Sequence, residues 1–359
     1  MTLHPVVSQS CPMAVKDSTE PGKRAFLTRF ITGFLVVTGV TVGGISATYT
    51  FGPIFGLYIM PPSMQRYGQI ALNILDEGVY ASGPAWEQMR TEVEEAISTA
   101  NSYDDLHPVL AKAAKIAGGK NSQLIPAPPA QSLPAPVFHT PTVAPAAGAT
   151  AKHPSVTTVT MPSLGMVDAE SQARYARVIA DGIDQAAPST CGYIVDVRNN
   201  SGKNMYPLLS GITALIPNGV SVIFATREDA RVEVTTHSDG AGVGGTVISV
   251  GDRIKRTHAP IAVLHGEQTS ASGEAVVTAL RGLPHVRTFG TPTAGHTSGS
   301  VTPRLYDGAT LTLTKNLYLD RFGNNLAEKP LQPDEHSENE SADETARQWL
   351  AAKKCPSKR

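Results

Sequence analysis

Several kinds of signal are scarce in this sequence. The 359 residues carry 30 Lys and Arg against 31 Asp and Glu, so the net charge of −1 gives no electrostatic reason to expect a nucleic-acid partner. The three cysteines, Cys11, Cys191 and Cys355, show no C-x-x-C or Cys/His spacing, so no zinc site is expected. Cys191 and Cys355 could form a disulfide outside the cytoplasm; otherwise Cys191 is a buried thiol and Cys355 an incidental tail thiol.

Common catalytic and nucleotide-binding motifs are also missing. There is no P-loop and no H-E-x-x-H, and nothing else indicates a metal or a cofactor. The absence of G-x-S-x-G excludes an α/β-hydrolase elbow. We therefore expect neither a metal nor a cofactor.

Charge is absent from one long N-terminal stretch, between Arg29 and Arg66. This stretch exceeds the ~20 apolar residues that cross a bilayer, and the basic residues before it favour a cytoplasmic N-terminus. We predict a disordered cytoplasmic tail over 1–25 and an anchor over 26–60, with the rest outside the cytoplasm. A cleaved signal peptide, with a processing site near residues 45–47, and a buried soluble helix are the alternatives.

The remaining chain divides by composition and periodicity. Residues 61–126 show helical spacing of apolar side chains, with a glycine pair at the end of the last helix. Residues 127–154 are rich in Pro and Ala and predict a linker or an extended arm. In 155–350 apolar strand patterns alternate with helical patterns, which predicts an α/β domain with a largely parallel sheet, followed by a tail over 351–359.

Three polar loops follow predicted strands in that domain. They are residues 196–204, 265–274 and 290–300, and each is rich in Gly, Ser, Thr or Asn. Ligands of parallel sheets usually bind beyond the carboxyl ends of the strands, so these loops are the candidate site. The simpler interpretation of TSASGE, residues 269–274, is ordinary capping of the following helix.

The loops also carry a family resemblance. The segments occur in the order GYIVDVRNNSGKNMYPLL, PIAVLHGEQTSASGEAV, RTFGTPTAG, LYDGATLTLT, DRFGNN and LQPD. Together they resemble the S41 serine peptidases, the tail-specific or C-terminal-processing proteases, over roughly 156–335. The resemblance implies a crotonase- or ClpP-like α/β core and serine-type peptide hydrolysis. No PDZ segment is evident.

Two positions depart from what the resemblance implies. The family nucleophile lies three residues before the glutamate of T-x-S-x-x-E, and counting back from Glu274 gives Ala271. One branch relies on a histidine in a G-H-S segment, and GGKNS has Asn121 in its place. Alanine cannot attack a carbonyl, and asparagine cannot accept a proton at neutral pH. The same departures would result from substitutions introduced at catalytic positions.

Neighbouring residues could take over these roles. Ser272 or Ser270 is the candidate replacement nucleophile, and His296, at the place of the lysine of the Ser/Lys branch, is the candidate base. The resemblance further implies an oxyanion hole formed by the N–H groups of Gly202 and Ser272. Lys203 stands where the N-x-G-G pattern has its second glycine, and is either a groove residue or a solvated side chain.

Two functions follow from these observations. The first is a membrane-anchored, extracytoplasmic S41-type peptidase that hydrolyses peptides or protein tails. The second is an inactive pseudopeptidase that keeps the groove and binds peptides or protein partners. The partners expected are a peptide or protein and the membrane, whereas the oligomeric state stays open.

Overall fold

The structure is a computed structural model that describes residues 60–127, 138–165 and 167–355. Pro61 to Arg359 forms one compact unit. The predicted tail and almost all of the predicted anchor lie outside the described residues. No helix among the described residues has the length and apolar character that a membrane span requires.

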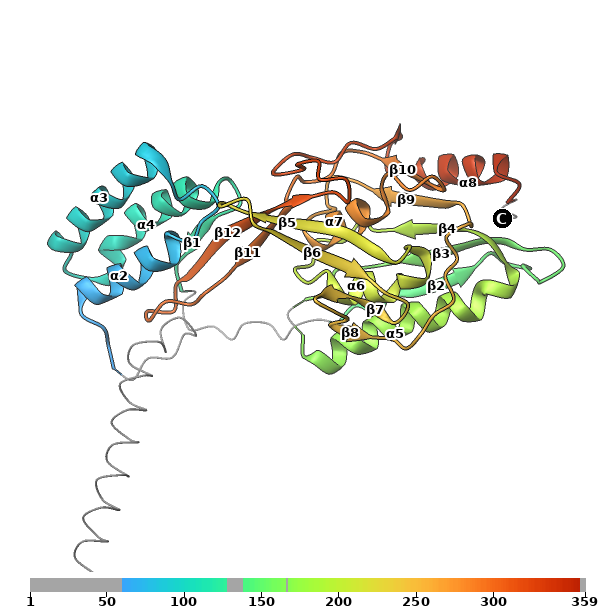
Figure 1. The fold of residues 1–359 in the computed structure, drawn as a ribbon, viewed down its shortest axis with the longest axis horizontal. Helices are drawn as coiled ribbons and strands as arrows, with labels where there is room; N and C mark the ends of the chain where they lie inside the picture. Colours follow the sequence, from blue (N-terminus) through green and yellow to red (C-terminus); the bar gives the residue numbers. More distant parts are fainter. Residues whose placement is uncertain (1–59, 128–137, 166, 356–359) are drawn as a thin grey trace, which may run out of the picture. The chain divides into compact units, whose positions relative to one another are not determined.

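Three helices form the predicted helical region at one end of this unit (Figure 1). They are α2 (Met64–Leu75), α3 (Gly83–Thr99) and α4 (Tyr103–Gly118). The N-cap of α4 is Ser102, whose side chain accepts from the N–H of Asp105 while the Asp105 carboxylate accepts from that of Ser102, which completes a capping box. Helix α4 ends at Gly119, whose φ of 76° favours glycine.

A six-stranded sheet lies at the centre of the α/β part and has the strand order β13-β10-β9-β4-β3-β2. All its neighbouring strands are parallel except β2 and β3, as expected from the alternating pattern. Its strands are β2 (Thr142–Pro145), β3 (Ser155–Thr160), β4 (Thr190–Asp196), β9 (Ile261–His265), β10 (Val286–Gly290) and β13 (Glu335–His336).

A second sheet is antiparallel, so the expectation of a largely parallel sheet is correct for only one of the two sheets. Its order is β1-β12-β5-β6-β7-β8, with β11 also paired to β12. The strands are β1 (Gln123–Ile125), β5 (Gly219–Thr226), β6 (Arg231–Thr236), β7 (Gly240–Val243), β8 (Ile248–Ser249), β11 (Ser298–Val301) and β12 (Thr310–Leu319).

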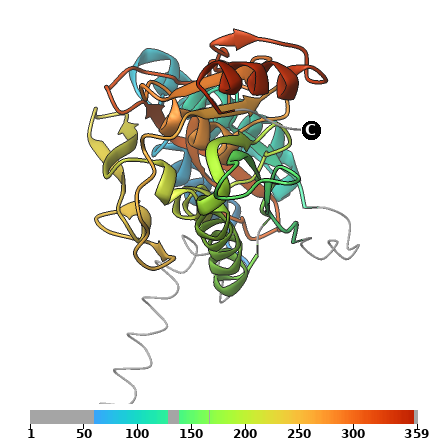
Figure 2. The same cartoon turned by 90° about the vertical axis from the view of Figure 1, so that its right-hand side faces the viewer.

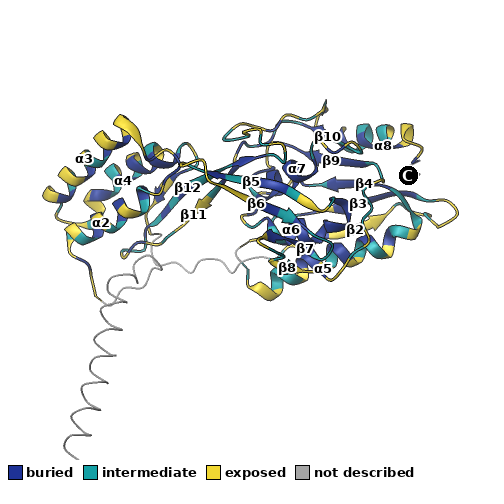
Figure 3. Ribbon diagram, viewed as in Figure 1, coloured by how far each residue is buried: buried dark blue, intermediate teal, exposed yellow. Residues whose placement is uncertain are grey.

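The six-stranded sheet buries both faces, because alternate residues of its strands point to opposite sides. In β4, Tyr193 and Val195 face the main core with α5 and the second sheet, whereas Ile194 faces α8. Figure 2 shows α8 and α5 on opposite sides of the sheet, and Figure 3 shows its inner strands β3, β4, β9 and β10 as largely buried. The flanking helices are α5 (Ala169–Ala186), α6 (Tyr206–Gly211), α7 (Ser272–Leu280) and α8 (Ala342–Ala352).

One of the alternatives left open by the sequence, the state of Cys191 and Cys355, is decided by the structure. Cys191 at the start of β4 and Cys355 after α8 form a disulfide, which ties the C-terminal helix to the sheet. Asp196 and Arg198 form an ion pair at the end of β4, with Oδ2 and Nη2 2.6 Å apart.

The predicted linker or arm over 127–154 is extended in part. Residues 142–145 form β2, an edge strand paired antiparallel with β3. A proline is tolerated at such an edge, since it removes a hydrogen bond that no neighbour needs. The sheet therefore begins before residue 155, the predicted domain boundary.

Strand β12 joins the helical region to the rest of the unit. Its residues 310–312 pair with β1, and 316–319 pair with β5. Leu311 and Leu313 are fully buried in the core that α2, α3 and α4 share. One strand thus belongs to both parts of the unit.

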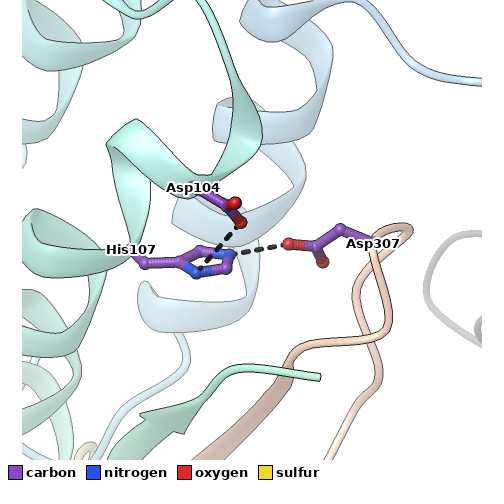
Figure 4. Close-up of side chains that lie close together, drawn as sticks. All are labelled: Asp104, His107 and Asp307. Carbon is purple, nitrogen blue, oxygen red and sulfur yellow. Dashed lines mark hydrogen bonds and ion pairs between the residues drawn. The ribbon is translucent and has the colours of Figure 1, made fainter. Parts of the chain in front are cut away.

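A histidine bound by two aspartates holds the turn before β12 (Figure 4). His107 Nε2 lies 2.6 Å from Asp307 Oδ2, and Nδ1 lies 3.6 Å from Asp104 Oδ1. The Tyr67 hydroxyl also donates to Asp307. The two carboxylates contact opposite ring nitrogens, so the side chains would have to rearrange to bind one metal ion together.

Candidate active site

A groove of about 720 Å³ lies where the helical region meets the loops of the α/β part, a volume typical of ligand sites. Each of the three predicted loops contributes to it. It is lined by Lys120, Asn121, Gln123, Ile125, Ser201, Lys203, Asn204, Met205, Tyr206, Phe224, Ser270, Ala271, His296, Ser298, Gly299, Ser300, Thr302, Thr312 and Tyr318.

Ala271 lies at the turn between β9 and α7 in a strained conformation. Its φ of 47° and ψ of −102° fall in a region that side chains other than glycine rarely adopt. Such outliers persist only where the surroundings fix them, and they concentrate at functional sites. The turn therefore presents residue 271 to the groove in a strained backbone conformation, with a methyl group as its side chain.

The buried carboxylate of Glu274 holds that turn through four hydrogen bonds. Its Oε2 accepts from the N–H of Ala271 at 3.0 Å and from that of His296 at 2.8 Å. Its Oε1 accepts from the N–H of Gly295 and the hydroxyl of Thr293. Burial raises the pKa of Glu274, while these hydrogen bonds oppose that rise. The carboxylate thus positions the backbone of residues 271 and 296 together.

The two candidate serines are placed differently. Ser272 is 1% exposed and does not line the groove; its hydroxyl donates to Asn200 Oδ1 at 3.0 Å. Ser270 lines the groove, and its N–H donates to the carbonyl of Asn200. Only Ser270 therefore has access to a ligand in the groove.

The two predicted oxyanion donors are already hydrogen-bonded in this conformation. The N–H of Gly202 donates to Asn200 Oδ1 at 3.3 Å, and the N–H of Ser272 donates to the carbonyl of Gly202 at 3.1 Å. An oxyanion would have to displace both contacts, so the structure does not present an open oxyanion hole at these two groups.

Asn121 and His296 face the groove from different walls. Asn121 follows the end of α4, and its Nδ2 donates to Ser298 Oγ at 3.4 Å. His296 is exposed and lies in the loop between β10 and β11. Asn121, Ala271, Ser270 and His296 therefore line one groove.

One wall of the groove was not predicted from the sequence. It consists of β11 together with side chains of β5 and β12, among them Phe224 and Tyr318. The apolar alternation of β12 was visible, but its position beside the three loops depends on the antiparallel sheet. The aspartates and histidine of Figure 4 do not line the groove.

Comparison with known proteins identifies a matching family and a relative of this chain. The model of peptidase family S41 matches residues 155–337. The nisin-resistance protein of Lactococcus lactis subsp. lactis is 29% identical over 323 residues, which are 90% of this chain and 97% of that protein.

Solved structures share the fold over most of the chain. A lipoprotein from Streptococcus agalactiae superposes with a TM-score of 0.67 and 26% identity, over 83% of this chain and 99% of that one. The photosystem II D1 C-terminal processing protease superposes with a TM-score of 0.55 over 82% of this chain and 99% of that one. At 12% identity, the second comparison supports the fold alone.

Proposed function

Since the chain belongs to peptidase family S41, we propose that it is a peptide-binding member of that family that no longer cleaves through a serine nucleophile. The observation that carries this proposal is Ala271, which keeps the strained nucleophile geometry and its hydrogen bond to Glu274 but has no hydroxyl. The surrounding turn therefore lacks the hydroxyl oxygen that would attack a peptide carbonyl.

The second departure supports the same conclusion. Asn121 lines the same groove as Ala271 of the β9–α7 turn (the elbow), at the place where the resemblance has a histidine that would accept the proton of the nucleophile. An amide can donate and accept hydrogen bonds but does not bind a proton near neutral pH. Because nucleophile and base act as a unit, losing the second adds little to the loss caused by the first.

The groove retains what peptide binding requires. Among the described strands, β11 pairs only with β12, and Ser298, Gly299 and Ser300 line the groove. An extended peptide can pair with such a strand through backbone hydrogen bonds, while its side chains enter neighbouring pockets. The aromatic rings of Tyr206, Phe224 and Tyr318 provide apolar surface for those side chains.

Residual hydrolysis by a shifted pair is the second candidate function. Ser270 and His296 both line the groove, which favours them over the buried Ser272. A displaced nucleophile works poorly, since an error of about 1 Å can cost ~10²-fold in rate.

The proposal places this domain outside the cytoplasm, on an N-terminal anchor. The uncharged stretch between Arg29 and Arg66 supports the anchor. The disulfide between Cys191 and Cys355 supports an oxidising compartment, where such bonds persist.

The test restores both positions in the full-length chain. Wild type, Ala271→Ser, Asn121→His and the double variant are treated with a fluorophosphonate probe and with a peptide library, and binding of nisin is measured because of the relative's name. We expect wild type to bind peptides without labelling or cleavage, and the double variant to gain labelling.

The other outcomes are informative as well. Labelling and cleavage by wild type would disprove the loss of activity, and Ser270→Ala would then show whether the shifted pair is responsible. No peptide binding by wild type would disprove the proposed function. Failure of the double variant to label would contradict the assignment of residues 121 and 271.

A further inference from the structure

The groove carries positive charge and no lining carboxylate. Its lining includes Lys120 and Lys203, together with His296, which adds charge when protonated. None of the lining residues is Asp or Glu. A concave surface of one sign concentrates ligands of the opposite sign, because the protein wall focuses the field.

Among these cationic groups, Lys203 has the positive charge that neighbouring acidic groups neutralise least. Its side chain is exposed, and no hydrogen bond or ion pair joins it to another residue that the structure describes. It follows Gly202 directly, in the turn whose carbonyl contacts the N–H of Ser272. A lysine therefore lines the same groove as Ala271 at the position where the S41 pattern has a glycine.

Lys120 is a second cation of the groove lining and is held by a hydrogen bond. Its Nζ donates to the backbone carbonyl of Glu328 at 2.6 Å, an acceptor that leaves the positive charge intact. The Glu328 carboxylate lies close to Lys120 and His296 and offsets part of their charge, which leaves Lys203 as the cation of the groove lining without a described acidic partner.

The carboxylate of Glu274 does not offset these cations at the groove surface. It is fully buried beneath the elbow, and both of its oxygens accept hydrogen bonds from residues 271, 293, 295 and 296. The groove surface itself therefore stays cationic.

We propose that this groove selects acidic peptides and disfavours basic ones, with Lys203 as the main specificity-determining residue. This inference rests on the peptide-binding function proposed above. An acidic side chain next to the elbow would pair with Lys203, and a second one towards the helical region would meet Lys120. A basic side chain in either place would be repelled.

The experiment measures binding of the full-length chain to fluorescein-labelled peptides of equal length by anisotropy. The peptides share one neutral scaffold and carry Glu, Gln or Lys at the same alternating positions. We expect the Glu peptide to bind about threefold to tenfold more tightly than the Gln peptide at low salt, as one unscreened contact between unit charges allows. The difference should shrink as salt rises.

Two variants and one control assign the preference. Lys203→Gly should remove most of the preference for Glu, and Lys203→Glu should reverse it in favour of the Lys peptide. Lys152→Glu makes the same charge change at an exposed lysine that does not line the groove, and should leave the preference unchanged. Thermal unfolding of each variant checks that it is folded.

The outcomes separate the two proposals. Equal binding of the Glu, Gln and Lys peptides by wild type would overturn the charge preference and leave peptide binding standing. The same preference in Lys203→Glu would overturn the role of Lys203. Absence of binding by all peptides, the Gln peptide included, would overturn the proposed function and this inference with it.

Discussion

Asn121 and Ala271 line the same groove, although one follows α4 of the helical region and the other precedes α7. Both stand where the family resemblance implies a catalytic residue. The two departures therefore concern one groove, and residue 271 is held in a strained backbone conformation there. The strained backbone at Ala271 leads to the first of four predictions.

Replacing Ala271 with glycine should stabilise the protein. The φ of 47° strains alanine, whereas glycine adopts it freely. Relief of ~1–3 kcal/mol of strain exceeds the entropic cost of glycine in the unfolded chain, so we expect the free energy of unfolding to rise by about 1 kcal/mol. Urea unfolding measures the change.

The matched control is Ala351→Gly, at an exposed position near the end of α8. Glycine there should destabilise the protein by up to ~1 kcal/mol, because it loses more entropy than alanine when the helix forms. A loss of stability in Ala271→Gly similar to that of the control would contradict the strain.

Acid should weaken the fold through His265. Its side chain is fully buried, Nδ1 is 3.0 Å from the carbonyl of Thr291, and burial lowers its pKa to about 4. The unfolded chain binds the proton near the ordinary value of 6.5, so the folded state loses stability as pH falls from about 6.5 to about 4. The full loss is about 3 kcal/mol.

The measurement is the free energy of unfolding against pH for wild type and His265→Gln. The variant should start lower but fall less steeply over that range. His336→Gln, at an exposed position, serves as the control and should keep the wild-type slope. Parallel profiles for wild type and His265→Gln would refute the prediction.

Reduction of the disulfide should destabilise the C-terminal helix and the sheet. Cys191 and Cys355 close a loop with a sequence separation of 164 residues. A loop of that length restricts the unfolded chain by an amount worth about 5 kcal/mol in the chain-entropy model, and measured values are typically 2–4 kcal/mol. Urea unfolding with and without reductant measures the loss.

Cys355→Ser is the matching variant, and reductant should have no further effect on it. A midpoint of wild type that does not respond to reductant would show that the bond contributes nothing to stability. Cys11→Ser is the control for the remaining cysteine, and should leave the response to reductant unchanged.

The contact between His107 and Asp307 should contribute to holding the turn before β12. Both side chains are largely buried, with Nε2 and Oδ2 2.6 Å apart. A double-mutant cycle with His107→Ala and Asp307→Ala should give a coupling energy of about 1–3 kcal/mol. Hydrogen exchange at residues 305–311 should speed up in either single variant, and additive effects of the two changes would contradict the coupling.

The sequence predicted the local features of the site better than the way its walls meet. The end of α4 at a glycine and the polar loops after β4, β9 and β10 follow from short-range signals, and all of them reach the groove. The burial of Ser272 could not be predicted, since it depends on Asn200, a residue far along the chain. From the sequence alone, either Ser270 or Ser272 of TSASGE could therefore be the serine that reaches the groove.

The antiparallel sheet is the main feature that the sequence did not predict, because it too depends on contacts between distant segments. Strands β6 and β7 are short and partly exposed, so they lack a clear apolar alternation. Strand β2 lies in a Pro- and Ala-rich segment that resembles a linker, and only its pairing with β3 makes it a strand. Such pairings join distant segments, which local patterns do not record.

The pairing of β12 with both β1 and β5 has a consequence for the order in which the protein is made. Helices α2 to α4 leave the ribosome early, but their core stays incomplete until Leu311 and Leu313 are synthesised near the other end of the chain. Domains usually fold from the N-terminus during synthesis. Here the first helices must wait for one of the last strands, which makes nascent folding of this chain dependent on its completion.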